Sequence, residues 1–267
     1  MPISTRRFGR LGNELYQYAA VIGYAIKHGL EYSLPDTTND NVWNPVHMAR
    51  LRHPNWEQGR EDVLINENWT AEQHYQELPF EEEWRDKQIV LNGYFQSFRY
   101  IAPYRDEIIK AFDYPYEMNN GVCAIHVRRG DYLLYPLKHP VVTDEYLIEA
   151  IWKMIDDVGC TNFLFHSDDI NWCKNFIERV GNKNINFEFS ENKTPEQDLV
   201  SMANCEHNIC SNSTLALWGA ELNQNPDKVV IVPHEDNWFG VDNKHLSVKD
   251  LYRPEWIRIK YTPIYDL

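Results

Sequence analysis

The chain has 267 residues, 43% of them hydrophobic and 25% charged, which suffices for one large α/β domain or two modest ones. Its formal net charge of −14 argues against nucleic acid and anionic membranes as main partners, because both require clustered Lys and Arg. The five cysteines are odd in number and irregularly spaced, which favours reduced, buried thiols over disulfides or a zinc site. The N-terminus is polar and basic and the apolar runs are strand-sized, so we expect a cytoplasmic protein without signal peptide or membrane anchor.

The first part of the chain predicts one strand–turn–helix unit followed by a long irregular stretch. After Gly12 the apolar residues recur with the helical period, and Gly29 is a typical helix stop. The following stretch is rich in Asn, Glu, Trp and His and is broken by prolines, so we expect irregular surface structure that covers a substrate cleft. The predicted elements are a strand at 3–8, a helix at 13–27, irregular structure at 36–88, a strand at 89–91 and a helix at 105–112.

From residue 121 onward, apolar strands and helices alternate. Thr143 is a helix N-cap followed by two acids, and Thr194 begins a capping box with Pro195 in the first helical position. The predicted strands are 122–127, 162–166, 185–189, a short one ending at 209–210, and 229–232; the predicted helices start at 143 and 194 or span 170–180 and 213–222. Repeated β–α units indicate a parallel sheet covered on both faces. Such sheets bind ligands beyond the carboxyl ends of their strands, which selects the loops 126–132, 166–169 and 211–214.

The strongest chemical signal is the segment His126-Val127-Arg128-Arg129-Gly130-Asp131-Tyr132 at a strand end. The planar fork of an arginine binds two diphosphate oxygens at once and stays charged, so we interpret Arg128 as a diphosphate ligand. Asp131 can orient one of the two guanidiniums. For Arg129 a structural pair with Asp131, closing the strand–loop junction, is an equally good interpretation.

Two acids, Asp168 and Asp169, stand at the next strand end. A carboxylate can accept both the ring and exocyclic N–H groups of guanine, which favours guanine over adenine. One of the two can instead cap the helix that starts near residue 170. A divalent metal is a further alternative, but metal-dependent transferases use a spaced acid pair, and here the arginines already supply positive charge, so we expect no metal.

The third segment is Ser211-Asn212-Ser213-Thr214, which precedes an apolar helix. Hydroxyls and free backbone N–H groups at a helix start form an anion site. An ordinary N-cap would show the same residues, so the segment gains weight only beside the arginine pair.

Together these segments resemble glycosyltransferase family 11, the α-1,2-fucosyltransferases. The central segment resembles the family motif H-x-R-R-G-D-Y, and the matches run from about residue 9 to 240. Glu14 departs from the usual Gln, and Tyr16 from the common Phe or Met. The other matching segments are Gly9-Arg10-Leu11-Gly12-Asn13 with Gln17-Tyr18-Ala19, Ser167-Asp168-Asp169, Ser211 to Thr214 with Trp218-Gly219-Ala220, and Trp238-Phe239.

The resemblance implies a GT-B type α/β fold, in which two Rossmann-like halves with parallel sheets flank a cleft. We expect an acceptor-side half at 1–118, a GDP-sugar-binding half at 119–245 and a tail at 246–267 that packs back on the protein. It also implies site residues for both substrates. These are His126 and Asp168 or Asp169 on guanosine, Arg128, Arg129, Ser211, Ser213 and Thr214 on the phosphates, and Arg10 and Asn13 on the acceptor side of the cleft.

The function so implied is metal-independent, inverting transfer of L-fucose from GDP-β-L-fucose to the 2-hydroxyl of a β-galactoside, with GDP-fucose as co-substrate and no cofactor. Arg128 would stabilise the leaving diphosphate. Glu14 and Asp131 are the candidate bases, although Glu14 fits a helix-dipole role equally well.

Two alternatives remain open: a GDP-fucose-dependent transferase of another linkage, and a catalytically silent protein that binds nucleotide sugar or glycan. The expected partners are GDP-fucose and an oligosaccharide that ends in galactose, with no nucleic acid and no membrane span. A homo-oligomer is left open.

Overall fold

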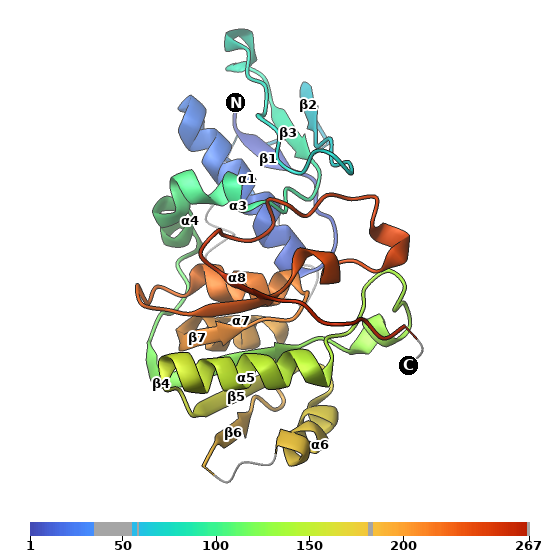
Figure 1. The fold of residues 1–267 in the computed structure, drawn as a ribbon. Helices are drawn as coiled ribbons and strands as arrows, with labels where there is room; N and C mark the ends of the chain where they lie inside the picture. Colours follow the sequence, from blue (N-terminus) through green and yellow to red (C-terminus); the bar gives the residue numbers. More distant parts are fainter. Residues whose placement is uncertain (35–54, 58, 181–183, 266–267) are drawn as a thin grey trace. The chain divides into compact units, whose positions relative to one another are not determined.

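The computed structural model describes residues 1–34, 55–57, 59–180 and 184–265. The chain divides into two compact units, unit 1 (Met1–Tyr114 with Lys249–Tyr252) and unit 2 (Pro115–Val248 with Arg253–Leu267). Each unit has its own parallel sheet with helices packed on it (Figure 1), so the predicted α/β fold built from two halves is confirmed. The roles assigned to 1–118, 119–245 and 246–267 stay predictions.

Unit 1 is built on a three-stranded parallel sheet in the order β1-β3-β2. The strand expected at 3–8 already ends at Thr5, whereas the first helix ends at Gly29 as predicted, with Gly29 in the left-handed region at φ 62°. The elements are β1 (Ile3–Thr5), α1 (Leu11–His28), β2 (Val63–Asn66), η1 (Glu82–Trp84), β3 (Ile89–Asn92), α3 (Phe98–Ile101), η2 (Ala102–Tyr104) and α4 (Arg105–Phe112).

The prediction of irregular structure over 36–88 is wrong at residues 63–66, which form β2. This strand pairs with β3 along its whole length and buries only Ile65, so its sequence lacks the alternating pattern of a half-buried strand. Residues 36–54 and 58 of that stretch lie outside the described residues.

Unit 2 contains a six-stranded sheet, again entirely parallel, in the order β6-β5-β4-β7-β8-β9. Its last strand was not predicted. The strands are β4 (Asn119–Val127), β5 (Asn162–Ser167), β6 (Asn186–Phe189), β7 (Cys205–Ile209), β8 (Val230–Pro233) and β9 (Ile257–Ile259). The helices are η3 (Gly130–Leu133), α5 (Asp144–Val158), α6 (Ile170–Val180), α7 (Pro195–Asn204), α8 (Thr214–Leu222), η4 (Glu235–Asn237) and η5 (Val241–Asn243).

The strand order of this sheet has one reversal point. From β4 the chain adds β5 and β6 on one side, then returns to add β7, β8 and β9 on the other. This is the order of doubly wound nucleotide-binding folds, in which ligands bind where the order reverses. In unit 2 that place is the carboxyl edge of β4 and β7.

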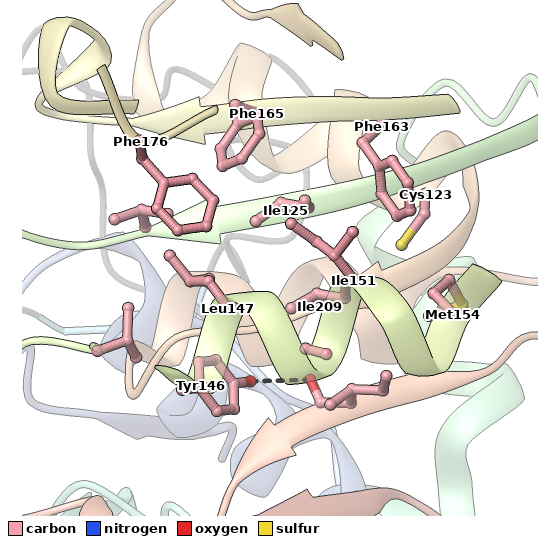
Figure 2. Packing of buried hydrophobic residues seen from close by; sticks show 14 of the residues in the cluster. Cys123, Ile125, Tyr146, Leu147, Ile151, Met154, Phe163, Phe165, Phe176 and Ile209 are labelled. Atoms are coloured by element: carbon pink, nitrogen blue, oxygen red, sulfur yellow. Dashed lines mark hydrogen bonds between the residues drawn. The ribbon is translucent and has the colours of Figure 1, made fainter. Parts of the chain in front are cut away.

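Both faces of β4 are buried from Cys123 to Val127, which explains the apolar run that begins at Val122. Cys123, Ile125 and Val127 pack into a cluster with residues of α5 and α6 (Figure 2). Ala124 points to the other face, where it packs with Met202 of α7. The helix starts are also as predicted: the hydroxyl of Thr143 accepts from the N–H of Tyr146, and the Thr194 capping box is complete.

All five cysteines are free and buried, as expected from their spacing. Within the described residues, no helix combines the length and the apolarity needed to cross a bilayer.

Tyr146 of α5 supports the carboxyl end of β7 through a hydrogen bond. Its side chain is buried, and its hydroxyl donates to the carbonyl of Cys210, directly after β7, at 2.5 Å. We expect Tyr146→Phe to lower the free energy of unfolding by about 1–3 kcal/mol, because a buried carbonyl loses its donor. Urea unfolding measures this, with the exposed Tyr135→Phe as a control within about 0.5 kcal/mol of wild type. An unchanged urea midpoint for Tyr146→Phe would contradict the supporting role.

Candidate functional site

The guanidinium of Arg128, directly after β4, is held between two carboxylates. Its Nη2 lies 2.5 Å from Oδ1 of Asp131, and its Nη1 lies 2.5 Å from Oδ2 of Asp168. The Arg128 side chain is 22% exposed. The guanidinium also lies over the ring of Tyr132, with its carbon 5.8 Å from the ring centroid. Asp131 therefore orients Arg128, one of the two guanidiniums that the sequence offered.

Gly130 is a steric requirement of this arrangement. A Cβ at this position would lie 2.4 Å from Oδ2 of Asp168, the same oxygen that pairs with Arg128. The other oxygen of Asp168 accepts from the backbone N–H of Arg129 at 2.9 Å. Asp168 thus joins the loop after β5 to the loop after β4, and any side chain at 130 would displace it.

Arg129 pairs with Asp169, not with Asp131 as the structural alternative proposed. Its Nε lies 3.2 Å from Oδ2 of Asp169, and its guanidinium carbon lies 4.4 Å from the ring centroid of Trp172. Only 14% of the Arg129 side chain is exposed. Trp172 was not among the predicted site residues. Its place in the first turn of the helix that follows the two acids could have indicated it.

Of the two adjacent acids, Asp169 serves as the helix cap. Its Oδ1 accepts from the N–H of Trp172 at 3.1 Å, and its own N–H donates to Oγ of Ser167. The alternative that one of the two acids caps the helix is therefore confirmed for Asp169. Asp168 instead contacts Arg128. A guanine contact by either acid stays a prediction.

The start of α8 lies at the end of β7, beside β4. Ser213 occupies the N-cap position, and Thr214 is the first helical residue. Ser211 is fully buried, and its Oγ lies 2.8 Å from Nδ1 of His126. The side-chain amide of Asn212 donates to the backbone carbonyls of Pro140 and Trp238. The backbone carbonyl of Asn212 accepts from the hydroxyl of Tyr132. The predicted phosphate loop 211–214 thus contacts both ends of the segment 126–132, with Ser211 at His126 and Asn212 at Tyr132.

Two buried histidines underlie this edge on neighbouring strands. His126 and His166 are register partners on β4 and β5. Burial lowers the pKa of His126 to about 3, with His166 and Arg128 as further causes, and burial lowers the pKa of His166 to about 4. His166 contacts Oγ of Ser201 at 3.0 Å. Both imidazoles are therefore neutral at physiological pH and can act as hydrogen-bonding groups but not as cations.

The charge balance of the cluster limits what it can bind as it stands. Two guanidiniums, Arg128 and Arg129, face three carboxylates, Asp131, Asp168 and Asp169. Among these five groups one negative charge is in excess. An anion such as a diphosphate can therefore use Arg128 fully only if it replaces one of the carboxylates there.

The residues predicted for the acceptor side, Arg10 and Asn13, lie in unit 1 at the start of α1, together with the other candidate base, Glu14. Oε1 of Glu14 accepts from Nη2 of Arg7 at 2.8 Å, and 9% of the Glu14 residue is exposed. Oδ1 of Asn13 accepts from the amide of Gln96 at 2.9 Å, and Arg10 occupies the N-cap position. Glu14 is thus neutralised by a cation and stands where a helix dipole favours an acid. Within the described residues, no three His, Cys, Asp or Glu side chains gather as metal ligands, and metal independence stays a prediction.

Comparison with models of known protein families identifies one family for this chain. The sequence profile of Glycosyl transferase family 11 matches residues 4–260. An alpha-1,2-colitosyltransferase of Escherichia coli is 26% identical over 97% of this chain and 99% of its own length. Galactoside 2-alpha-L-fucosyltransferase SEC1 of Bos taurus is 26% identical over 80% of this chain and 62% of the relative. Among solved structures, POFUT1 in complex with GDP-fucose has a TM-score of 0.47 and 12% identity, over 86% of this chain and 97% of that chain.

The neutral histidines predict a pH dependence of stability. Unfolded histidines take up protons as pH falls through about 6.5, whereas His126 and His166 in the fold do so only near 3 and 4. Their contribution is complete above pH 6.5 and is lost as pH falls, by up to about 1.4 kcal/mol per pH unit for each histidine.

We therefore expect His166→Gln to reduce the slope of unfolding free energy against pH between about 6 and 5 by up to one histidine's contribution. Urea unfolding at several pH values measures the slope. The exposed His245→Gln is the matched control. Equal slopes for His166→Gln and wild type would show that His166 does not stay neutral.

Proposed function

Because the chain belongs to glycosyltransferase family 11, whose profile spans almost its entire length, we propose that it moves L-fucose from GDP-β-L-fucose to the 2-hydroxyl of a β-galactoside, with inversion and without a metal. The observation that carries this proposal is the position of Arg128. This residue, whose side chain is 22% exposed, follows β4 where the strand order of unit 2 reverses, and the neighbouring strand β7 leads to the start of α8. That is where a doubly wound sheet binds a diphosphate.

The reaction is a direct displacement. The acceptor oxygen attacks the anomeric carbon, the bond from that carbon to the diphosphate oxygen breaks, and GDP leaves with the bonding electrons. Negative charge grows on the diphosphate as this bond lengthens. Arg128 and the backbone N–H groups at the start of α8 stabilise that charge, and the acceptor's proton passes to a base.

We infer that the diphosphate replaces Asp131 as the partner of Arg128. Of the two carboxylates on Arg128, Asp131 is 40% exposed and Asp168 is 25% exposed. Asp168 is also held by the N–H of Arg129, so Asp131 is the easier one to displace. The exchange frees Nη2 of Arg128 for a diphosphate oxygen, while Asp168 keeps its hold on Nη1.

Asp131 is also the better supported base. Once released from Arg128, its carboxylate has lost that cation and can turn toward the acceptor oxygen, which attacks opposite to the leaving diphosphate. Glu14 would have to leave Arg7 first, and it is nearly buried. We therefore assign proton acceptance to Asp131, with Glu14 as the alternative.

A second donor is favoured by one comparison. The match to the colitosyltransferase covers nearly all of both chains. Colitose is the 3-deoxy counterpart of fucose, so the two donors differ by one hydroxyl group. A site that hydrogen-bonds this hydroxyl rejects the deoxy sugar strongly, whereas a site that leaves it in solvent accepts both.

The proposal is tested by incubating the full chain with GDP-fucose or GDP-colitose and with lactose or lacto-N-biose, with and without EDTA, and determining the linkage of the product. We expect an α-1,2-linked product whose yield EDTA does not change. Arg128→Ala should lower turnover at least about a hundredfold, as for loss of one transition-state donor. Arg60→Ala, which removes an exposed paired arginine in unit 1, should leave it unchanged. Near-normal transfer by Arg128→Ala, or loss of activity with EDTA, would refute the mechanism.

If the diphosphate replaces Asp131 at Arg128, substitution of Asp131 should affect GDP binding and the rate of transfer in opposite directions. Asp131→Asn should tighten GDP binding by up to about fivefold, because an exposed ion pair that competes for Arg128 is worth at most about 1 kcal/mol. The same variant should slow transfer by about a hundredfold or more through loss of the base.

Calorimetric titration with GDP and initial rates measure the two effects. The control is Asp157→Asn, which removes an exposed carboxylate paired with Lys153 on α5. Weaker GDP binding by Asp131→Asn would mean that Asp131 supports Arg128 in the complex and does not compete with the diphosphate.

A further inference from the structure

Three aromatic rings follow the three strands of the unit 1 sheet at their carboxyl ends. Phe8 comes three residues after the end of β1, Tyr94 two after the end of β3, and Trp69 three after the end of β2. The ring contacts run in the order of the strands: the centroids of Phe8 and Tyr94 are 5.9 Å apart, and those of Tyr94 and Trp69 are 6.5 Å apart. His74 extends this row, stacked on Trp69 at 5.2 Å. We call Phe8, Tyr94, Trp69 and His74 the aromatic row.

The row differs from core packing because three of its rings reach solvent. Tyr94 is 38% exposed, and Phe8 and Trp69 are partly exposed. His74 at the end of the row is buried, and burial lowers its pKa to about 4, so the row ends in a neutral imidazole. Core rings of this protein such as Phe95 are fully buried. An uncharged aromatic strip at a ligand-binding edge of a parallel sheet is suited to an apolar surface of a ligand.

Polar side chains hold the backbones of two of these aromatic residues in place. The amide of Gln17, which is fully buried, accepts from the N–H of Phe8 at 3.0 Å and donates to its carbonyl at 2.8 Å. The carboxylate of Glu67 accepts from the N–H groups of Tyr94 and Phe95 at 2.6 and 3.0 Å. The rings are thus fixed in advance of any ligand, which lowers the entropy lost on binding.

The turn that carries Tyr94 is strained. Phe95 has φ 53°, the left-handed region that non-glycine residues rarely adopt. A Cβ at Gly93 would lie 2.3 Å from Cβ of Glu67, so this turn and the Glu67 carboxylate require each other. Strain of this kind is retained mainly where it serves a site.

We propose that the aromatic row is a stacking platform for the pyranose ring of the acceptor, with β-galactose as the sugar that it binds. The axial 4-hydroxyl of galactose leaves the hydrogens on C3, C4 and C5 on one apolar face, which packs on aromatic rings. Polar groups for the sugar's hydroxyls stand at the same edge, namely the paired amides of Asn66 and Asn92 at the ends of β2 and β3. Gln96, two residues after Tyr94, also ties this turn to Asn13 on α1.

This inference rests on the proposed function for the identity of the ligand, but its test does not depend on turnover. Binding of lactose and lacto-N-biose to the full chain is measured by saturation-transfer NMR, and GDP binding by calorimetry. Tyr94→Ala and Trp69→Ala should each weaken disaccharide binding, and raise the acceptor KM, by about tenfold, while the GDP Kd stays within about twofold. Tyr94→Phe keeps the ring and should bind like wild type. Tyr116→Ala removes a comparably exposed tyrosine from unit 2 and serves as control.

Because GDP is proposed to bind unit 2, the fold of unit 1 in each variant is checked separately, by a far-ultraviolet circular-dichroism spectrum and a urea unfolding curve that match wild type. The proposal is overturned if wild type binds neither disaccharide, if both alanine variants bind them as wild type does, or if sedimentation shows that the row instead joins two copies of the chain. Disaccharide binding that depends on the row, in a chain that binds no GDP, would support the platform and refute the proposed transfer. GDP binding without disaccharide binding would refute the platform and support only the donor site at Arg128.

Discussion

The ion pairs of Arg128 govern the arrangement of the donor edge. A guanidinium at the end of a buried strand needs counter-charge as long as no ligand is present, because a half-buried cation without partners is costly. Asp131 and Asp168 supply it from two different loops. The absence of a side chain at Gly130 is a consequence, since Asp168 occupies that space. If Arg128 binds the diphosphate as proposed, carboxylates of the chain itself stabilise this arginine while no ligand is bound.

The sheet makes this arrangement possible by keeping charge out of its interior. Both faces of β4 are apolar from Val122 to Ile125, and His126 near its end and its register partner His166 on β5 are neutral. The charged groups therefore gather beyond the carboxyl ends of β4 and β5. The start of α8, which follows the neighbouring strand β7, adds the positive end of a helix dipole. Position in the fold, more than the number of basic residues, makes this acidic chain suited to an anionic donor.

Local patterns predicted what local forces determine. The apolar run before Arg128, the Thr194 capping box and the stop at Gly29 are each decided within a few residues, and each was predicted from the sequence. β2 and β9 were missed because both are short edge strands, whose pairing partners and not their own sequences define them. For the same reason Arg129 was given the neighbour Asp131 as a partner, when Asp169, forty positions away, reaches it across the sheet edge.

The aromatic row shows the same limit more sharply. Phe8, Trp69 and Tyr94 share no motif and are far apart in the sequence, and only the order β1-β3-β2 makes them neighbours. If the two proposals hold, the units divide the work by chemistry: unit 2 meets the donor with charges that compensate each other, and unit 1 meets the acceptor with uncharged rings. Substitution of a ring changes which sugar face packs on it and leaves the ion pairs of Arg128 intact. A fold divided in this way can change its acceptor by altering residues just beyond three short strands, while the charge arrangement that stabilises the leaving group stays constant.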